Sequence, residues 1–600
     1  MLSALHALNA AGYAAALAMF AAGAIIWWRR AGAPVTCPCQ KLRRRFRRSF
    51  PLAFLILGAM AFLGGVIYAP SNYDALAYRL PRVLHWLDAG HWEWVHTIFD
   101  RLNNRSCGIE WVSAPVIALC HGLRLLFLIN FISFLFLPGL VYSVFTRLGV
   151  RPRVAWHWMW LAPTGYCFLL QAGSIGNDLF GTVFVLAAVD LALRAGKDGG
   201  FTAFGTSVLA AGLITAAKTN NLPLLLPYGV ALLPALKWAL RRPVATVAVA
   251  LLALGGSGLP TIYFNVHYAG DWSGAVLSNG NIKYAAVYRL GANTVSMVEQ
   301  NLAPPVFPMA ERWNAAVKSH IPAGLSGKLQ VLIEPPGGWF PLTQMQTEEG
   351  AGWGFGLTAL VGASLVAASL SGKKKRASTF SWPRLVRWAS VVTLVALLTQ
   401  SNVSAVGRLF SAYYLLPCTV ILGMAGNEDL VRRLWWRAAS GMVFAMAAVL
   451  LVISPARPLF PVGTMLAKIR PLEATHPLYE RVDNVYATYR DRPTAFAGGI
   501  AELPPGLSVL GYLAYDMPET SLWLPFGARR IVQVCPEDTA AELKAKGATY
   551  ILAEKEEFES RIQGPLAGWL SARNAVVARE ISLRLRAGKP PLTWYLIQLN

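Results

Sequence analysis

The feature that most constrains this chain is a series of about 12 apolar runs, each roughly 20 residues long and therefore able to cross a bilayer. They lie at about 2–28, 50–69, 125–146, 154–172, 178–194, 201–217, 221–237, 243–264, 352–371, 388–403, 408–425 and 438–454. Such a set predicts a mostly α-helical bundle that spans a membrane many times. With 55% hydrophobic and only 14% charged residues, the chain is not a string of soluble domains.

The placement of basic residues predicts which loops are cytoplasmic. Basic clusters follow the first run and then recur in alternate loops, at residues 29–48, 147–153, 194–197, 237–242, 373–387 and 432–437. Because positive loops stay inside, the N-terminus and the three long segments 70–124, 265–350 and 456–600 should face outward. The net charge of +23 is then a topology signal, and we expect no nucleic-acid partner.

These patterns divide the chain into three predicted regions. Residues 1–49 form an anchor span and a basic cytoplasmic loop, residues 50–455 the transmembrane domain, and residues 456–600 a small outward α/β domain. The last prediction depends on strand-like runs that flank a helix-like segment, Ala540–Gly547. The strand-like runs are Ser508–Leu513, Arg530–Val534, Thr549–Leu552 and Thr593–Leu599.

An ionisable cluster follows the second apolar run, where hydrophobicity does not explain it. Asp74, Tyr78, Arg82 and His85 recur at helical spacing and are expected to share one face, with Arg79 beside it. A carboxylate next to two arginines suits a base that faces an anionic substrate. The alternative is that Asp74 caps a helix while Arg79 and Arg82 reach lipid headgroups.

Four further polar residues are expected on the same outward side. Asn177 and Asp178 open one span, Lys218 ends another, and Arg408 begins a third. Taken singly, Asp178 could cap its helix and the two cations could anchor to lipid phosphate. Two outward cations together with two outward aspartates favour one shared polar site.

The arrangement of these motifs resembles the membrane-embedded glycosyltransferases of the GT-C fold, in particular bacterial relatives of the protein mannosyltransferases and the aminoarabinose transferases. The resemblance covers roughly residues 50–425. The matching motifs are Asn72-Tyr73-Asp74 with Tyr78-Arg79-Leu80-Pro81-Arg82, Gly176-Asn177-Asp178, Lys218, and Arg408 ahead of Tyr413–Pro417. The family also has a long first outer loop and an outward soluble tail. One departure is the extra span before the basic loop.

The resemblance implies a polyprenyl-phosphate monosaccharide donor and transfer on the outward side of a bacterial inner membrane. Asp74 would take the proton from the acceptor hydroxyl as it attacks the anomeric carbon, with inversion. Asp178 would be the second acidic position, and Lys218 and Arg408 would neutralise the departing phosphate. Further candidates are Arg79 and Arg82 for the phosphate, and Asn72, Tyr78, Asn177 and Tyr413 for positioning the acceptor or donor.

Neither a metal nor a cofactor is expected. The Cys37–Cys39 pair has no second pair at zinc spacing, and the histidines of the first outer loop lack the spacing of a metalloprotease helix. Asp74 has no adjacent second acid, so we predict metal-independent transfer. Glu348 and Glu349 are interpreted as part of a solvated loop. A disulfide among the outward residues Cys107, Cys120 and Cys535 stays open.

Two other functions fit parts of the pattern. A transporter or flippase would bind a polar or lipid-linked substrate through the same outward charges, although no internal repeat is present. A lipid-linked polymer ligase would share the outward site and differ only in using a donor that carries a sugar chain. The acceptor, whether lipid, glycan or protein, is not indicated by any motif.

Overall fold

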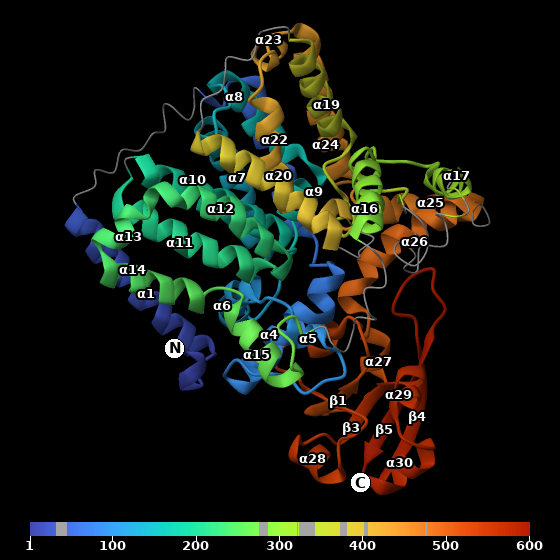
Figure 1. Ribbon diagram of the computed structural model, residues 1–600. Helices are drawn as coiled ribbons and strands as arrows, with labels where there is room; N and C mark the ends of the chain where they lie inside the picture. Colours follow the sequence, from blue (N-terminus) through green and yellow to red (C-terminus); the bar gives the residue numbers. More distant parts are fainter. Residues whose placement is uncertain are drawn as a thin grey trace.

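The computed structural model describes residues 1–31, 45–197, 199–274, 286–320, 322, 324, 342–371, 381–400, 406–473 and 477–600. This part of the chain is mostly helical and ends in a five-stranded sheet (Figure 1). The predicted combination of a helical bundle and a small C-terminal sheet is therefore confirmed, whereas the number of twelve spans stays a prediction.

The first half of the chain combines five helices of 18 to 22 residues with several shorter helices and turns. They are α1 (Ala10–Ala31), α3 (Ser49–Ile67), α4 (Leu80–Ala89), α5 (Arg101–Asn104), α6 (Gly108–Cys120), α7 (Phe127–Arg147), α8 (Pro152–Leu161), α9 (Tyr166–Ala172), α10 (Asp178–Lys197), α11 (Gly200–Ala217), α12 (Leu225–Leu232), α13 (Lys237–Arg241), α14 (Pro243–Gly255) and α15 (Leu259–Ala269). A π-helical turn, Ala75–Arg79, precedes α4.

The second half of the chain adds further helices, some before the first strand of the C-terminal sheet in the sequence and some after it. They are α16 (Ala286–Asn301), α17 (Ala310–His320), α19 (Phe355–Leu370), α20 (Trp382–Gln400), α21 (Val406–Leu409), α22 (Ser411–Leu422), α23 (Asn427–Leu430), α24 (Leu434–Ile453), α25 (Val462–Glu473), α26 (Pro477–Asp491), α27 (Ala497–Ala501), α28 (Ala540–Ala545), α29 (Lys555–Arg561) and α30 (Leu566–Ala572).

Within the described residues, six helices are long and apolar enough to cross a membrane, and a seventh crossing results if α14 and α15, bent by 54°, are one span. Several other predicted spans are interrupted. The run 154–172 contains a 3-10 turn with Pro163 between α8 and α9, and the run 221–237 contains 3-10 turns with Pro223 and Pro234. Proline removes a backbone donor and clashes with the preceding turn, which favours a break in the helix at these points.

The bundle buries α10 at its centre and leaves apolar faces of the outer helices uncovered. α10 packs against α7, α11, α12 and α22. In contrast, α1, α3, α7 and α14 expose large apolar side chains. The exposed set includes Phe20, Ile56, Phe136 and Leu251. A face of this kind is compatible with lipid as its solvent.

The C-terminal sheet has the strand order β2-β1-β3-β5-β4. The strands are β1 (Val509–Leu513), β2 (Arg530–Gln533), β3 (Tyr550–Glu554), β4 (Ala575–Leu583) and β5 (Leu592–Leu599). β1 pairs in parallel with β2 and β3, and β5 joins β3 and β4 in antiparallel register. Four strands and α28 lie where the sequence predicts them; β4, an edge strand with a largely exposed pattern, is not foreseen.

The C-terminal sheet docks on the segment 70–124, the predicted first outer loop, which holds the predicted acidic site. The 3-10 turn Glu519–Trp523 contacts both the π turn and α4, and β2 contacts α4. Thr520 Oγ1 donates a hydrogen bond to the carbonyl of Leu76 at 2.7 Å, and the sheet lies below α4 and α5 in Figure 1. Two segments more than 400 residues apart in the chain are therefore adjacent at this end of the molecule.

Candidate active site

Asp74 lies at the start of the π-helical turn that follows α3. The side chain of Asp74 makes no capping hydrogen bond; instead Asn72 Oδ1 accepts from the backbone N–H of Ala75 at 3.1 Å. The alternative that Asp74 serves as a helix cap is therefore wrong. Hydrogen bonds in a π turn run from residue i to residue i+5, so Arg79 rather than Tyr78 lies one turn after Asp74. Arg79 Nη2 is 3.3 Å from Asp74 Oδ2.

Arg408 connects the two aspartates predicted from the sequence. Its Nη2 lies 3.2 Å from Asp74 Oδ2, and its Nε lies 3.8 Å from Asp178 Oδ2. The backbone N–H of Gly407 donates to Gln300 Oε1 at 2.6 Å, which fixes α21 against α16. The expected shared polar site therefore exists in the structure.

Asp178 is held by Lys218 and by a residue that the motifs did not indicate. Lys218 Nζ lies 2.5 Å from Asp178 Oδ1, and Gln171 Nε2 donates to Asp178 Oδ2 at 2.9 Å. Gln171 Oε1 in turn accepts from the backbone of Leu179 at 3.0 Å. Asn177 donates to the carbonyl of Ala217 at 2.8 Å, so the start of α10 is fixed to the end of α11.

A cavity of about 170 Å³ opens beside these residues. Its lining consists of Asp74, Tyr78, Arg79, Arg101, Arg105, Ser106, Asn177, Lys218, Thr219, Asn220, Arg408 and Leu409. Five lining side chains are cationic and one is a carboxylate, so the cavity attracts anions. Among the described residues, the Nε atoms of Arg79 and Arg408 are buried without a hydrogen-bond acceptor. Buried donors of this kind are expensive unless an acceptor reaches them.

The electrostatics of Asp74 follow from its position between two guanidinium groups. Burial raises the pKa of Asp74, but Arg408 and Arg79 outweigh burial and lower it to about 2. Asp74 is consequently a carboxylate at neutral pH. Its side chain is 23% exposed, so a ligand can reach it.

Arg82 and His85 do not face the cavity, and the expectation that Asp74, Tyr78, Arg82 and His85 share one face is wrong. The π turn shifts the register, so Arg82 Nη2 pairs with Glu110 at 2.6 Å and His85 Nε2 lies 3.0 Å from Glu519 Oε1. The other Arg82 amino group donates to the carbonyl of Arg105 at 2.6 Å.

Two of the predicted positioning residues, Tyr413 and Tyr78, contact residues that line the cavity. Tyr413 is buried and its hydroxyl donates to the carbonyl of Asn220, a cavity residue, at 2.5 Å. Tyr78 lines the cavity and packs on Phe99, and the Arg79 guanidinium carbon lies 5.6 Å from the centre of its ring.

Glu348 and Glu349 are not in a solvated loop, which corrects that interpretation. Glu348 is buried against Arg457. Glu349 Oε1 accepts from the backbone N–H of Tyr73 at 2.8 Å and lies 2.5 Å from Arg492 Nη1. Because Tyr73 precedes Asp74, this contact ties the acidic site to the C-terminal part of the chain.

The cysteines in the described part of the chain are free thiols. Cys107 and Cys535 are buried and Cys120 is exposed, and none of the three is in a disulfide. Cys37 and Cys39 lie outside the described residues.

Removing one partner of the buried pair Arg82–Glu110 should be strongly destabilising. Both side chains are 2% exposed, so Glu110→Ala leaves an unpaired buried guanidinium and should lower the free energy of unfolding by about 3–5 kcal/mol. Thermal unfolding in detergent measures the effect. Replacing both partners, as Arg82→Met with Glu110→Leu, should restore much of the loss. A Glu110→Ala variant as stable as the parent would contradict this prediction.

No protein-family model and no curated protein matches the chain. Solved structures similar to it include ArnT from Cupriavidus metallidurans, in the apo state (13% identity) and bound to undecaprenyl phosphate (14% identity). Each covers 91% of this chain and 97% of its own, with a TM-score of 0.39. The Archaeoglobus fulgidus oligosaccharyltransferase, in complex with Zn and sulfate, covers 86% of this chain and 70% of its own, at 12% identity and the same TM-score of 0.39.

Proposed function

We propose that this chain is a membrane glycosyltransferase that moves one sugar from a polyprenyl-phosphate donor to an acceptor on the outward side of a bacterial inner membrane. The observation that carries the proposal is the cavity in which the Asp74 carboxylate is held between Arg79 and Arg408 among five cationic side chains. A base beside an anion site is what transfer from a phosphate leaving group requires.

The proposed reaction is a single displacement. The acceptor hydroxyl oxygen bonds to the anomeric carbon, the bond from that carbon to the phosphate oxygen breaks, and Asp74 takes the hydroxyl proton. The electron pair of the broken bond stays on the polyprenyl phosphate, and the configuration at the anomeric carbon inverts. Arg408, Lys218 and Arg79, which line the cavity, stabilise the charge on the leaving phosphate.

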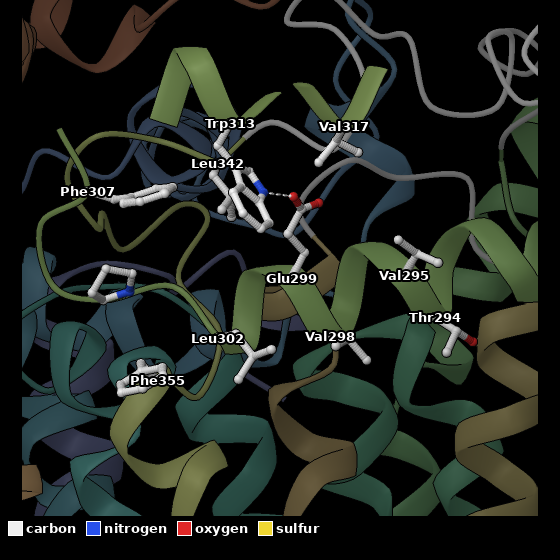
Figure 2. Close-up of a pocket in the computed structure, with 11 residues that line it drawn as sticks. Thr294, Val295, Val298, Glu299, Leu302, Phe307, Trp313, Val317, Leu342 and Phe355 are labelled. Carbon is white, nitrogen blue, oxygen red and sulfur yellow. Dashed lines mark hydrogen bonds between the residues drawn. The ribbon is translucent and has the colours of Figure 1, made fainter. Parts of the chain in front are cut away.

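The lipid chain of the donor is proposed to lie in an apolar cavity beside α16. It measures about 650 Å³ and lies between α16, α17 and the start of α19 (Figure 2). Val298, Leu302 and Phe355 are among its lining residues. Figure 2 shows the single carboxylate there, Glu299, hydrogen-bonded to Trp313. The same helix contacts α21 through Gln300, so one element joins the apolar cavity to the segment that carries Arg408.

Filling the apolar cavity with a larger side chain should weaken the binding of long-chain donors but not of short-chain donors. Val298→Trp is expected to weaken binding of a long-chain polyprenyl phosphate at least tenfold, because each buried methylene contributes about 0.8 kcal/mol. Binding of a short-chain analogue with the same phosphate should not change. The matched control is Val287→Trp on the same helix, where the side chain is 76% exposed and lies outside the cavity. Equal losses for both chain lengths would contradict this placement.

Recognition of the phosphate is testable without knowing the sugar. Polyprenyl phosphate should raise the unfolding temperature of the purified protein in detergent, whereas polyprenol of the same length should not. Equal effects of phosphate and alcohol, or no effect of either, would contradict the proposed donor class. Phosphate-dependent binding without any transfer of label would favour the flippase interpretation.

A further inference from the structure

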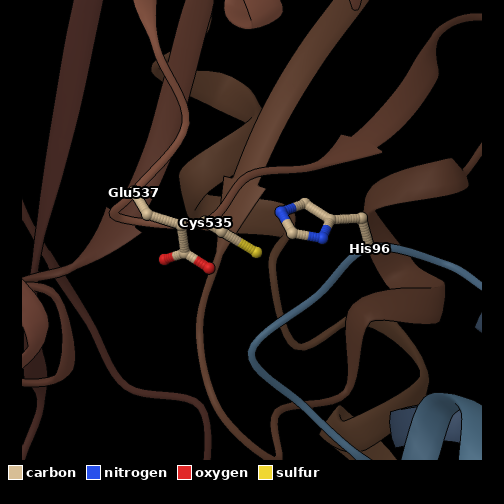
Figure 3. Close-up of side chains that lie close together, drawn as sticks. All are labelled: His96, Cys535 and Glu537. Carbon is tan, nitrogen blue, oxygen red and sulfur yellow. The ribbon is translucent and has the colours of Figure 1, made fainter. Parts of the chain in front are cut away.

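Three side chains of metal-ligand type meet at the junction between the first outer loop and the C-terminal sheet. His96 lies in the loop between α4 and α5, and Cys535 and Glu537 lie between β2 and α28 (Figure 3). One potential ligand atom from each residue lies within 4.8 Å of the other two. Figure 3 shows the Cys535 sulfur between the Glu537 carboxylate and the His96 ring.

The backbone on both sides of this cluster is fixed by hydrogen bonds of neighbouring residues. Asp538 Oδ2 accepts from the N–H of Cys535 at 2.9 Å and lies 2.5 Å from Lys546 Nζ. Thr97 Oγ1 donates to Gln533 Oε1, at the end of β2, at 2.8 Å. The loop that carries His96 is thereby attached to the strand that leads to Cys535.

We infer that His96, Cys535 and Glu537 bind a divalent transition metal ion of the zinc class, which joins the first outer loop to the C-terminal sheet. A thiolate, an imidazole and a carboxylate form a donor set that zinc prefers. In a tetrahedral site, zinc–ligand bonds of about 2.0–2.3 Å place two ligand atoms about 3.3–3.8 Å apart. The three ligand atoms, which lie within 4.8 Å of one another, must therefore approach by up to about 1–1.5 Å, a shift that side-chain rotations can supply.

The surroundings of the cluster also suit an ion. The side chain of His96 is 60% exposed and Glu537 is exposed, so the ion has a path from solvent, while Cys535 is buried. Asp538 Oδ1, 3.3 Å from His96 Nε2, is placed to orient the imidazole or to occupy the fourth position. None of these residues lines the cavity at Asp74, and the inference does not depend on the proposed transferase activity.

Metal titration of the full-length protein tests this site directly. The parent for the test carries Cys37→Ser and Cys39→Ser, since those two thiols could bind zinc themselves. After chelator treatment and dialysis, the protein is titrated with Zn²⁺ against a chromophoric zinc indicator, and separately with Co²⁺. We expect one tight equivalent of Zn²⁺ and, with Co²⁺, a near-ultraviolet thiolate charge-transfer band.

Substitutions separate this site from adventitious binding. Cys535→Ser should abolish the charge-transfer band, and His96→Ala and Glu537→Gln should weaken Zn²⁺ binding at least tenfold. Cys120→Ser, which removes an exposed thiol elsewhere, should change neither. His96 and Glu537 are exposed, so their variants should stay folded even if Cys535→Ser does not. Zn²⁺ binding that His96→Ala and Glu537→Gln leave unchanged, no binding by the parent, or a Co²⁺ complex without the thiolate band would each overturn the inference.

Discussion

Replacing Asp74 with asparagine is expected to abolish sugar transfer. Asparagine has nearly the same shape but cannot accept the acceptor's proton, and loss of a general base costs about 10²–10⁴-fold in rate. The substitution also removes a negative charge from a cavity lined by five cations, so donor affinity should hold or increase. The measurement is kcat for transfer of labelled sugar together with the Kd for polyprenyl phosphate.

The matched control for this result is Asp88→Asn. Asp88 belongs to the same outer loop, but its carboxylate pairs with Arg530 of the C-terminal sheet and lies outside the cavity. The control should transfer sugar at the parent rate. An Asp74→Asn enzyme with unchanged kcat would exclude Asp74 as the base.

Replacing Arg408 with glutamine should weaken donor binding and shift the pH profile. Hydrogen bonds to a charged group contribute about 1.5–3 kcal/mol, so the Kd for polyprenyl phosphate should rise about 10–100-fold. Arg408 is also the main cause that lowers the pKa of Asp74 to about 2. Without Arg408 this pKa should rise, and the base should lose its charge at a higher pH than in the parent.

The pH dependence of kcat separates these two effects. In the parent, Asp74 stays ionised until the pH approaches about 2, so its protonation does not limit the rate under ordinary conditions. In Arg408→Gln the acid limb should move to higher pH. Arg530→Gln, which removes an arginine 51% exposed on the C-terminal sheet, should leave both donor affinity and the pH profile unchanged. An Arg408→Gln enzyme with parental donor affinity would contradict the assigned phosphate role.

The sequence identified the main charged residues of the site because topology brings them together. Asp74, Asp178, Lys218 and Arg408 each occur at the end of an apolar run, and ends of spans on one side of a bilayer must meet at the same surface. In the structure, Arg408 contacts both aspartates and Lys218 contacts Asp178. The number of spans and the side of the membrane stay predictions from the same pattern.

What the sequence could not show depends on local register and on docking. The π turn after Asp74 directs Arg82 and His85 away from the cavity, and a helical-face argument assumes a regular period of 3.6 residues. Gln171 has no charge to mark its role in holding Asp178. The contact of Glu349 with Tyr73 and the approach of His96 to Cys535 both join segments hundreds of residues apart. Spacing along a chain carries no signal for such contacts.

The central claim is that the cavity at Asp74 transfers a sugar from a polyprenyl-phosphate donor. Its most direct test is incubation of the purified protein and its Asp74→Asn variant with radiolabelled polyprenyl-phosphate sugars and a bacterial envelope extract as acceptor. We expect label to leave the lipid and enter the acceptor with the parent protein only. Label that stays on the lipid with both proteins, under conditions in which the donor binds, would contradict the claim.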